Sequence, residues 1–254
     1  MISMAEHDTL ARTVTKAGMI LLENGAETNR VEDTMHRLCK AYGASIVDTY
    51  ATPTLLIVSF TLNGQLVHNI KRIHIQSTNL SRVDAVNTLS RKACAGQLTC
   101  EQLDEMLDDV KNSTPYSISF RIIGAAVCTF GFALFFSGTL MDALCAGLIG
   151  AVIQSLTILL VHYRISAIFR NIIGGAILTA LSIFVSRFAG ASINTVSISV
   201  LMLLVPGLAI TNAIKDSVNG DLVSGLAKGL ESILTAISIA VGSGFVLIVC
   251  GGLL

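Results

Sequence analysis

The side chains best suited to chemistry lie in one polar segment close to the C-terminus, with strongly apolar sequence on both sides. This segment, LLVPGLAITNAIKDSVNGDLVSGLAKGLES, runs from Leu203 to Ser232 and contains two Asp, two Lys, a Glu and a Pro-Gly pair. Charged groups are costly to place in lipid, so in apolar surroundings they pair with one another or line a path for ions or solutes. The segment is therefore the first candidate for a functional site.

A Pro-Gly pair interrupts the helix that begins this segment. Pro206 lacks a backbone N–H and clashes with the preceding turn, and Gly207 adds backbone freedom. We therefore expect a kink or a break at these two residues. Backbone groups that a break exposes must face protein or water rather than lipid, and transporters bind substrate at such breaks.

Polar residues continue beyond the break at helical spacing. Thr211 and Lys215 are four residues apart, as are Asn212 and Asp216, so each pair shares a helix face. The next helix carries a stripe of small or polar residues in steps of three and four: Asp221, Ser224, Lys228, Glu231, Thr235, Ser238 and Gly242. Such a stripe on a membrane helix should face the bundle or a water path.

Two interpretations of these residues stay open. In the functional one, Thr211, Asn212 and Ser224 bind a small zwitterion through neutral groups. Ionisable groups then couple its movement to protons, and these are Asp216, Glu231 and Lys228. In the structural one, the helix end with Asp216 is solvated in the cytoplasm, Asp221 is an N-cap, Ser224 permits close helix packing, and Lys228 pairs with Glu231.

The composition indicates that part of the chain lies in a bilayer. Of its 254 residues, 52% are hydrophobic and 13% are charged, against about 25% charged in average globular chains. The formal net charge is zero, so no basic field favours nucleic acid as a partner. The six cysteines show no C-x-x-C pair and no His at zinc spacing, and we expect neither a metal site nor a cofactor.

The more polar first half, residues 1–115, predicts a cytoplasmic α+β domain that ends at Pro115. We expect a helix that stops at Gly25, a second helix over residues 27–42, and strands over 45–50, 54–62 and 65–75. Asn63-Gly64 predicts a hairpin between the last two strands, because both residues accept positive φ. Further helices should begin near Ser81 and at Thr99, where T-x-x-Q matches a capping box.

The second half, residues 116–254, predicts a membrane α-helical bundle of five transmembrane helices. A span needs about 20 mostly apolar residues. Two spans fit between Arg121 and Arg164, and the others fit residues 166–188, 194–214 and 222–250. A buried soluble helix bundle is the alternative, but these segments lack a polar face.

The distribution of Lys and Arg sets the expected orientation. With the N-terminal domain inside, five of the basic residues lie at cytoplasmic helix ends, namely Arg121, Arg164, Arg170, Lys215 and Lys228, and Arg187 lies outside. This follows the excess of basic residues in cytoplasmic loops. We therefore expect a multi-pass protein of the cell (inner) membrane with a cytoplasmic N-terminus and an external C-terminus.

Two long motifs resemble the threonine/serine exporter (ThrE) family. The polar segment from Leu203, including Thr211, Asn212 and Asp216 in TNAI-x-D, is similar to the family signature, and LLENGAETNRVEDTMHRLCKAYG (residues 21–43) is similar to its cytoplasmic motif. The resemblance implies proton-driven efflux of small amino acids or small carboxylates. Single-chain members have two membrane halves, so this chain resembles the split form, in which a smaller multi-span membrane protein supplies the second half. A homo-oligomer also stays open.

Two rival functions remain. A regulatory membrane protein without transport activity would use the polar stripe to dock the helices of a partner. A membrane-anchored hydrolase would use carboxylates of the first domain with His68 or His74, but the sequence has no nucleophile elbow, metal spacing or phosphate loop to support it. We therefore do not expect an enzyme.

Overall fold

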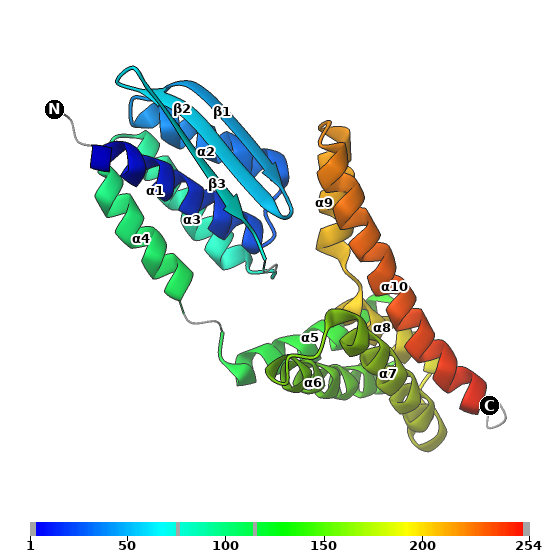
Figure 1. Cartoon of the computed structure of the whole chain (residues 1–254). Helices are drawn as coiled ribbons and strands as arrows, with labels where there is room; N and C mark the ends of the chain where they lie inside the picture. Colours follow the sequence, from blue (N-terminus) through cyan, green and yellow to red (C-terminus); the bar gives the residue numbers. More distant parts are fainter. Residues whose placement is uncertain (1–3, 75–76, 114–115, 251–254) are drawn as a thin grey trace. The chain divides into compact units, whose positions relative to one another are not determined.

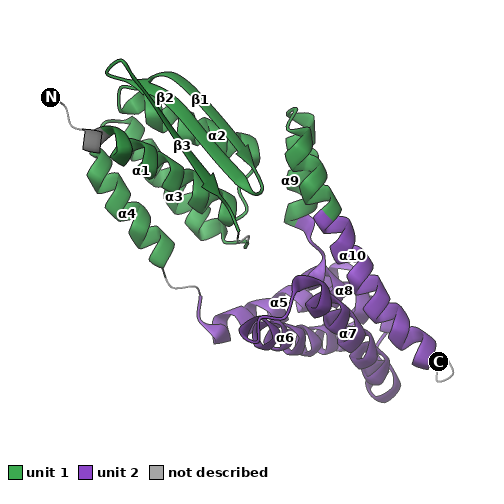
Figure 2. Ribbon diagram, viewed as in Figure 1, with its two compact units in different colours: residues 1–114, 208–230 green, residues 115–207, 231–254 purple. Residues whose placement is uncertain are grey.

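The structure is a computed structural model that describes residues 4–74, 77–113 and 116–250 (Figure 1). The chain forms two compact units (Figure 2). The first contains residues 1–114 together with 208–230, and the second contains residues 115–207 and 231–254. The polar segment therefore groups with the N-terminal domain, although it lies far from that domain in the sequence. Pro115, our predicted boundary, falls outside the described residues.

The N-terminal part of the first unit has three layers. Its elements are α1 (Met4–Glu23), α2 (Thr28–Ala41), β1 (Ser45–Thr52), β2 (Leu55–Leu62), β3 (Gln65–Arg72), α3 (Leu80–Cys94) and α4 (Cys100–Asn112). The strands form an antiparallel sheet in the order β1-β2-β3. Helices α1 and α2 pack on this sheet, and α3 and α4 pack on α1 (Figure 1). The predicted α+β character of this region is confirmed.

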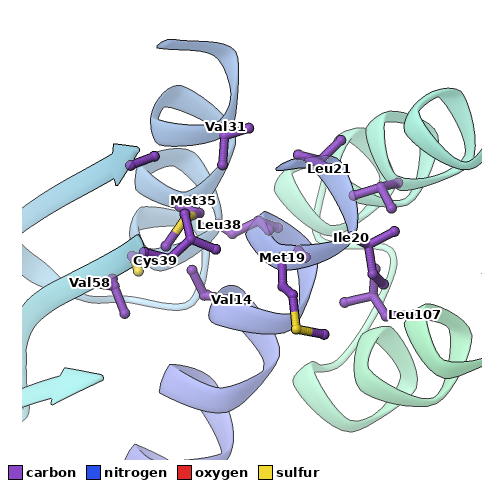
Figure 3. Packing of buried hydrophobic residues seen from close by; sticks show 14 of the residues in the cluster. Val14, Met19, Ile20, Leu21, Val31, Met35, Leu38, Cys39, Val58 and Leu107 are labelled. Atoms are coloured by element: carbon purple, nitrogen blue, oxygen red, sulfur yellow. The ribbon is translucent and has the colours of Figure 1, made fainter. Parts of the chain in front are cut away.

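The core of this part lies between the sheet and the helices. In β2 the side chains of Leu56, Val58 and Phe60 are fully buried and alternate with half-buried neighbours, as the two-residue period of a strand requires. Val31 and Met35 of α2 belong to the same buried cluster as these strand residues, together with side chains of α1 (Figure 3). Burial of these apolar faces supplies most of the stabilisation, at about 25 cal/mol per Å².

Local signals in the sequence placed the turns correctly. Asn63 and Gly64 both have positive φ, at 52° and 79°, and they join β2 to β3 as a tight hairpin. Thr99 and Gln102 form the expected capping box at the start of α4. Gly25 follows α1 with φ of 92°, a conformation that glycine adopts without strain.

The other helices of the described residues follow in the second half of the chain. They are α5 (Ile118–Phe135), α6 (Leu140–His162), α7 (Ala167–Ala189), α8 (Ile193–Leu204), α9 (Gly207–Val218) and α10 (Leu222–Cys250). Within the described residues, α5, α6, α7 and α10 are each long and apolar enough to cross a membrane. Helices α8 and α9 meet at a 57° bend and make a fifth span only if the pair crosses together. Four spans, or five with the bent pair, agree with the predicted helical membrane bundle.

The second unit has a buried apolar core of its own, and two polar or glycine contacts add to it. Asp142, at the start of α6, caps that helix with Thr139 and accepts a 2.6 Å hydrogen bond from the backbone of Ser192 just before α8. On the other side, Gly175 of α7 and Gly242 of α10 let the two backbones touch, since a Cβ at either position would collide with a carbonyl of the facing helix. Small residues serve the same purpose in many membrane helix pairs.

Candidate functional site

The polar segment folds into a helical hairpin, which we call the α9–α10 hairpin (residues 207–230). Helix α8 ends at Leu204 and α9 begins at Gly207, and the two helices meet at a 57° bend beside the Pro206-Gly207 pair. At the far end of α9, Gly220 has φ of 96°, and Asp221 N–H bonds back to the carbonyl of Asp216 at 2.8 Å. A left-handed glycine of this kind ends a helix with its last carbonyls satisfied.

Small residues let the two arms of the hairpin pack closely. Gly225 of α10 lies against α9, where an added Cβ would collide with the Ser217 hydroxyl and come within 2.9 Å of the Ala213 carbonyl. Ser224 beside it is also buried. The predicted role of Ser224 in close packing therefore agrees with its position, and its role in solute binding stays a prediction.

Asp216 lies at the centre of the site and is completely buried. Its Oδ2 accepts hydrogen bonds from Lys228 Nζ at 2.7 Å and from Thr28 Oγ1 at 3.0 Å, and its Oδ1 accepts one from Thr28 N–H at 3.2 Å. Lys228 Nζ also donates to Thr28 Oγ1 at 3.2 Å. Three elements, α2, α9 and α10, thus meet in one buried polar cluster of Thr28, Asp216 and Lys228.

This cluster caps α2 with a carboxylate from a distant part of the chain. The N-cap residue of α2, Glu27, makes no side-chain cap bond, and Thr28 N–H is the first of the backbone donors that have no partner within the helix. Asp216 supplies the missing acceptor. A negative charge at a helix N-terminus is also favoured by the helix dipole, by about 0.3–1 kcal/mol and more when partly buried.

Two further contacts hold the α1–α2 turn against the hairpin. Asn212 Nδ2 donates to the Gly25 carbonyl at 3.0 Å, and Lys215 Nζ lies 2.8 Å from Glu27 Oε1. The Asn212 amide is buried, whereas the Lys215 side chain is half exposed. The turn thus contacts the hairpin through a buried cluster, a buried amide and an outer ion pair.

Two carboxyl groups near the buried cluster, Asp221 and Glu32, have raised pKa values. Burial raises the pKa of Asp221, and so does the charge of Asp216, while Lys228 opposes both. Burial also raises the pKa of Glu32 on α2, against the hydrogen bond from Ala51 N–H, and the charges of Asp221 and Asp216 add to the rise. The ionised forms of Asp221 and Glu32 are therefore less favoured in this arrangement than in water.

The structure brings only part of the predicted set together. Asn212, Asp216 and Lys228 converge on the α1–α2 turn, while Thr211 lies on the exposed side of α9 and Glu231 lies exposed on α10, outside the first unit. A small cavity of about 150 Å³ lies beside Asn212, between α1, α2, α3 and the start of α9. In the described part of the chain, no group of three or more His, Cys, Asp or Glu could hold a metal ion.

Thr28 is the residue that sequence reasoning missed. Its signal was present, because GAETNR begins a helix with Glu at the N-cap position, where Ser, Thr, Asp or Asn is preferred. A helix start without its own cap needs an acceptor from elsewhere. The sequence alone could not say that Asp216 supplies it.

Fold and site together define a membrane protein whose N-terminal α+β domain contacts the α9–α10 hairpin. A family model described as "Putative threonine/serine exporter" (ThrE) matches residues 12–250. The chain therefore belongs to the threonine/serine exporter family, as its motifs predicted. This is a family of transporters, which agrees with the expectation that the protein is not an enzyme.

Two curated relatives carry related names. A "Probable threonine/serine exporter" of Mycobacterium tuberculosis is 23% identical over 226 residues, which cover 88% of this chain and 43% of the relative. A "Threonine/serine exporter" of Corynebacterium glutamicum is 23% identical over 255 residues, which cover 96% of this chain and 52% of the relative. The chain thus spans about half the length of these relatives. No solved structure shows a significant match.

Proposed function

We propose that this protein is one subunit of a secondary efflux transporter that exports small polar metabolites, such as threonine, serine or small dicarboxylates, in exchange for protons. The names of the relatives favour export, and the broken α8–α9 pair is typical of a transport site. The observation that carries the proposal is the buried Asp216, which joins the hairpin beyond this break to the soluble domain.

In this mechanism the docked domain is a gate. Asn212 and Asp216 are both engaged by the α1–α2 turn in the described conformation, so a solute can bind them only after the turn moves away. Protonation of Asp216 would remove its attraction for Lys228 and for the N-terminus of α2. Thr211, Asn212 and Ser224 then bind the solute, while Asp216, Lys228 and Glu231 carry the coupled proton.

The transporter is completed by a partner. Because the chain spans about half the length of its relatives, we propose that a smaller multi-span membrane protein supplies the other half. The chain lies in the cell membrane with its N-terminus in the cytoplasm and its C-terminus outside. The hairpin tip then lies on the cytoplasmic side, where the soluble domain can reach it.

Export from vesicles tests this function. Vesicles that contain the chain and its partner are loaded with radiolabelled threonine, serine or succinate, and efflux is followed after a proton gradient is imposed. We expect gradient-dependent efflux that Asp216→Asn and Asn212→Ala reduce by at least about tenfold, because in this mechanism Asp216 carries the proton and Asn212 binds the solute. Asp221→Asn is the control, since it removes an equal charge in the same hairpin without breaking a contact to Thr28.

A regulatory role without transport is the second candidate. It is favoured by the same docking contacts, because here the polar residues bind protein rather than solute. Vesicles that show no efflux of any of these solutes, with an intact complex of chain and partner, would support this alternative. Efflux that persists in both variants would show that the site assignment is wrong.

A further inference from the structure

A basic groove lies between α2 and α3 in the soluble domain, separate from the buried cluster. Its volume is about 350 Å³, and three arginines line it, Arg30 and Arg37 from α2 and Arg91 from α3. Among its lining residues one, Asp33, is acidic, so the groove carries a local charge of about +2. Binding sites for small ligands start at roughly this size, near 300 Å³.

The groove has polar walls as well as charge. Its half-buried part includes the hydroxyls of Thr34 and Ser90 and the amide of Asn87. The arginines lie at the exposed rim, where Arg37 pairs with Asp33 at 2.9 Å and both side chains are more than half exposed. Exposed i,i+4 ion pairs of this kind contribute only about 0.3–0.5 kcal/mol, so Arg37 can turn to a ligand at little cost.

Each guanidinium also has donors to spare. Arg91 donates to Thr88 Oγ1, and Arg30 Nε lies 3.7 Å from Glu27 Oε2. A guanidinium has five N–H donors, so one contact leaves most of them available. Arginine forks bind phosphate oxygens in pairs, and a phosphate monoester carries a charge of about −1.5 to −2 at pH 7, which matches the charge of the groove.

We propose that the α2–α3 groove binds a small phosphate-bearing anion and that this ligand regulates the docking contact. The groove shares Arg30 and Asn87 with the cavity beside Asn212. Glu27 lies near both Arg30 and Lys215. When a ligand draws Arg30 away, Glu27 no longer shares its charge between two cations, and the ion pair between Glu27 and Lys215 becomes stronger. Binding of the ligand does not depend on the proposed export function. The effect of the ligand on the gate rests on that proposed function.

Calorimetry on the full chain in detergent tests the binding, with inorganic pyrophosphate, inorganic phosphate and succinate as probes at constant ionic strength. We expect pyrophosphate to bind to the wild type and the double variant Arg37→Gln/Arg91→Gln to bind at least about tenfold more weakly, since it loses two charged donors. Arg72→Gln, which removes an exposed arginine from β3, is the matched control and should change the affinity less than about twofold.

The outcomes separate this proposal from its rivals. Absence of pyrophosphate binding to the wild type, or an equal loss in the double variant and in Arg72→Gln, would overturn it. Succinate that binds as tightly as pyrophosphate would show that the site does not select phosphate. Intact pyrophosphate binding together with loss of the contact between Thr28 and Asp216 would contradict only the proposed gate. Failure of the groove proposal and failure of the proposed function can therefore be told apart.

Alkylation of Cys94 gives a second readout. This exposed thiol lines the groove. Its modification can be followed by peptide mass spectrometry in the same sample as that of Cys100, a half-buried thiol at the start of α4. We expect pyrophosphate to slow alkylation of Cys94 severalfold and to leave Cys100 unchanged. An unchanged rate at Cys94 would contradict binding in the groove.

Discussion

Replacement of Asp216 by alanine should weaken the contact between the N-terminal domain and the α9–α10 hairpin. The change removes three hydrogen bonds to one buried carboxylate, two from Thr28 and one from Lys228. It also removes the ion pair of Lys228, whose side chain is only 11% exposed. Loss of one member of a buried ion pair costs about 3–5 kcal/mol, so the docked state should weaken by at least about 3 kcal/mol, roughly a hundredfold in population.

Amide hydrogen exchange at the start of α2 measures this effect. Thr28 N–H bonds directly to Asp216, and its exchange rate reports local opening of the contact. In Asp216→Ala we expect this amide to exchange roughly a hundredfold faster, while amides in the middle of α2 change much less. Asp33→Ala is the matched control, because it breaks an exposed pair with Arg37 on the same helix and should cost less than about 1 kcal/mol.

A double variant separates the charge from the packing. In Asp216→Ala/Lys228→Met the buried ammonium is gone as well, so the loss should be clearly smaller than the sum of the two single losses. Equal acceleration of the Thr28 amide in Asp216→Ala and Asp33→Ala, or additive effects in the double variant, would refute the reasoning.

Three further predictions concern stability, each measured on the full chain in detergent. Gly225→Ala should destabilise the hairpin by about 1–3 kcal/mol, because its Cβ meets Ser217 and Ala213, whereas Gly229→Ala, whose nearest contact is 4.0 Å away, should not; equal melting temperatures by circular dichroism would contradict this. Gly242→Ala should separate α7 from α10 and lower the melting temperature, while Gly244→Ala, in open space in this chain, should be tolerated; a larger loss in the control would show that the glycine contact is unimportant. Burial alone would raise the pKa of Asp104, but hydrogen bonds from Lys16 and Thr13 outweigh burial and leave that pKa below its usual range. The contribution of Asp104 to the stability of the fold is therefore present above pH about 4 and is lost as pH falls through the lowered pKa. Asp104→Asn should flatten the acid limb of a plot of melting temperature against pH, and an unchanged limb would contradict the assignment.

The sequence predicted the elements well because each carries a local signal. Asn63-Gly64 determines a turn through its own backbone preferences, Thr99 and Gln102 cap a helix that they themselves begin, and Pro206 interrupts a helix through its missing N–H. Length and hydropathy likewise identified the apolar helices. None of these predictions needs information about distant parts of the chain.

The site was only partly predictable because its partners are far apart in the sequence. Spacing placed Asn212 and Asp216 on one face of a helix. The structure shows that both are buried, so the interpretation of a solvated Asp216 was wrong. Their partners, Gly25 and Thr28, lie more than 180 residues away, and helical periodicity carries no information at that distance. The sequence therefore predicted the polar face of α9. Only the structure shows that the N-terminus of α2 covers this face.

The most direct test of the central claim follows the docking contact during transport. Hydrogen exchange at the Thr28 amide is compared in vesicles of the chain with its partner, with and without threonine and a proton gradient. We predict that solute and gradient together accelerate exchange at Thr28 in the wild type and have no further effect in Asp216→Ala, where the gate is already open. Continued export with an unchanged exchange rate at Thr28 would contradict the claim that this contact is the gate.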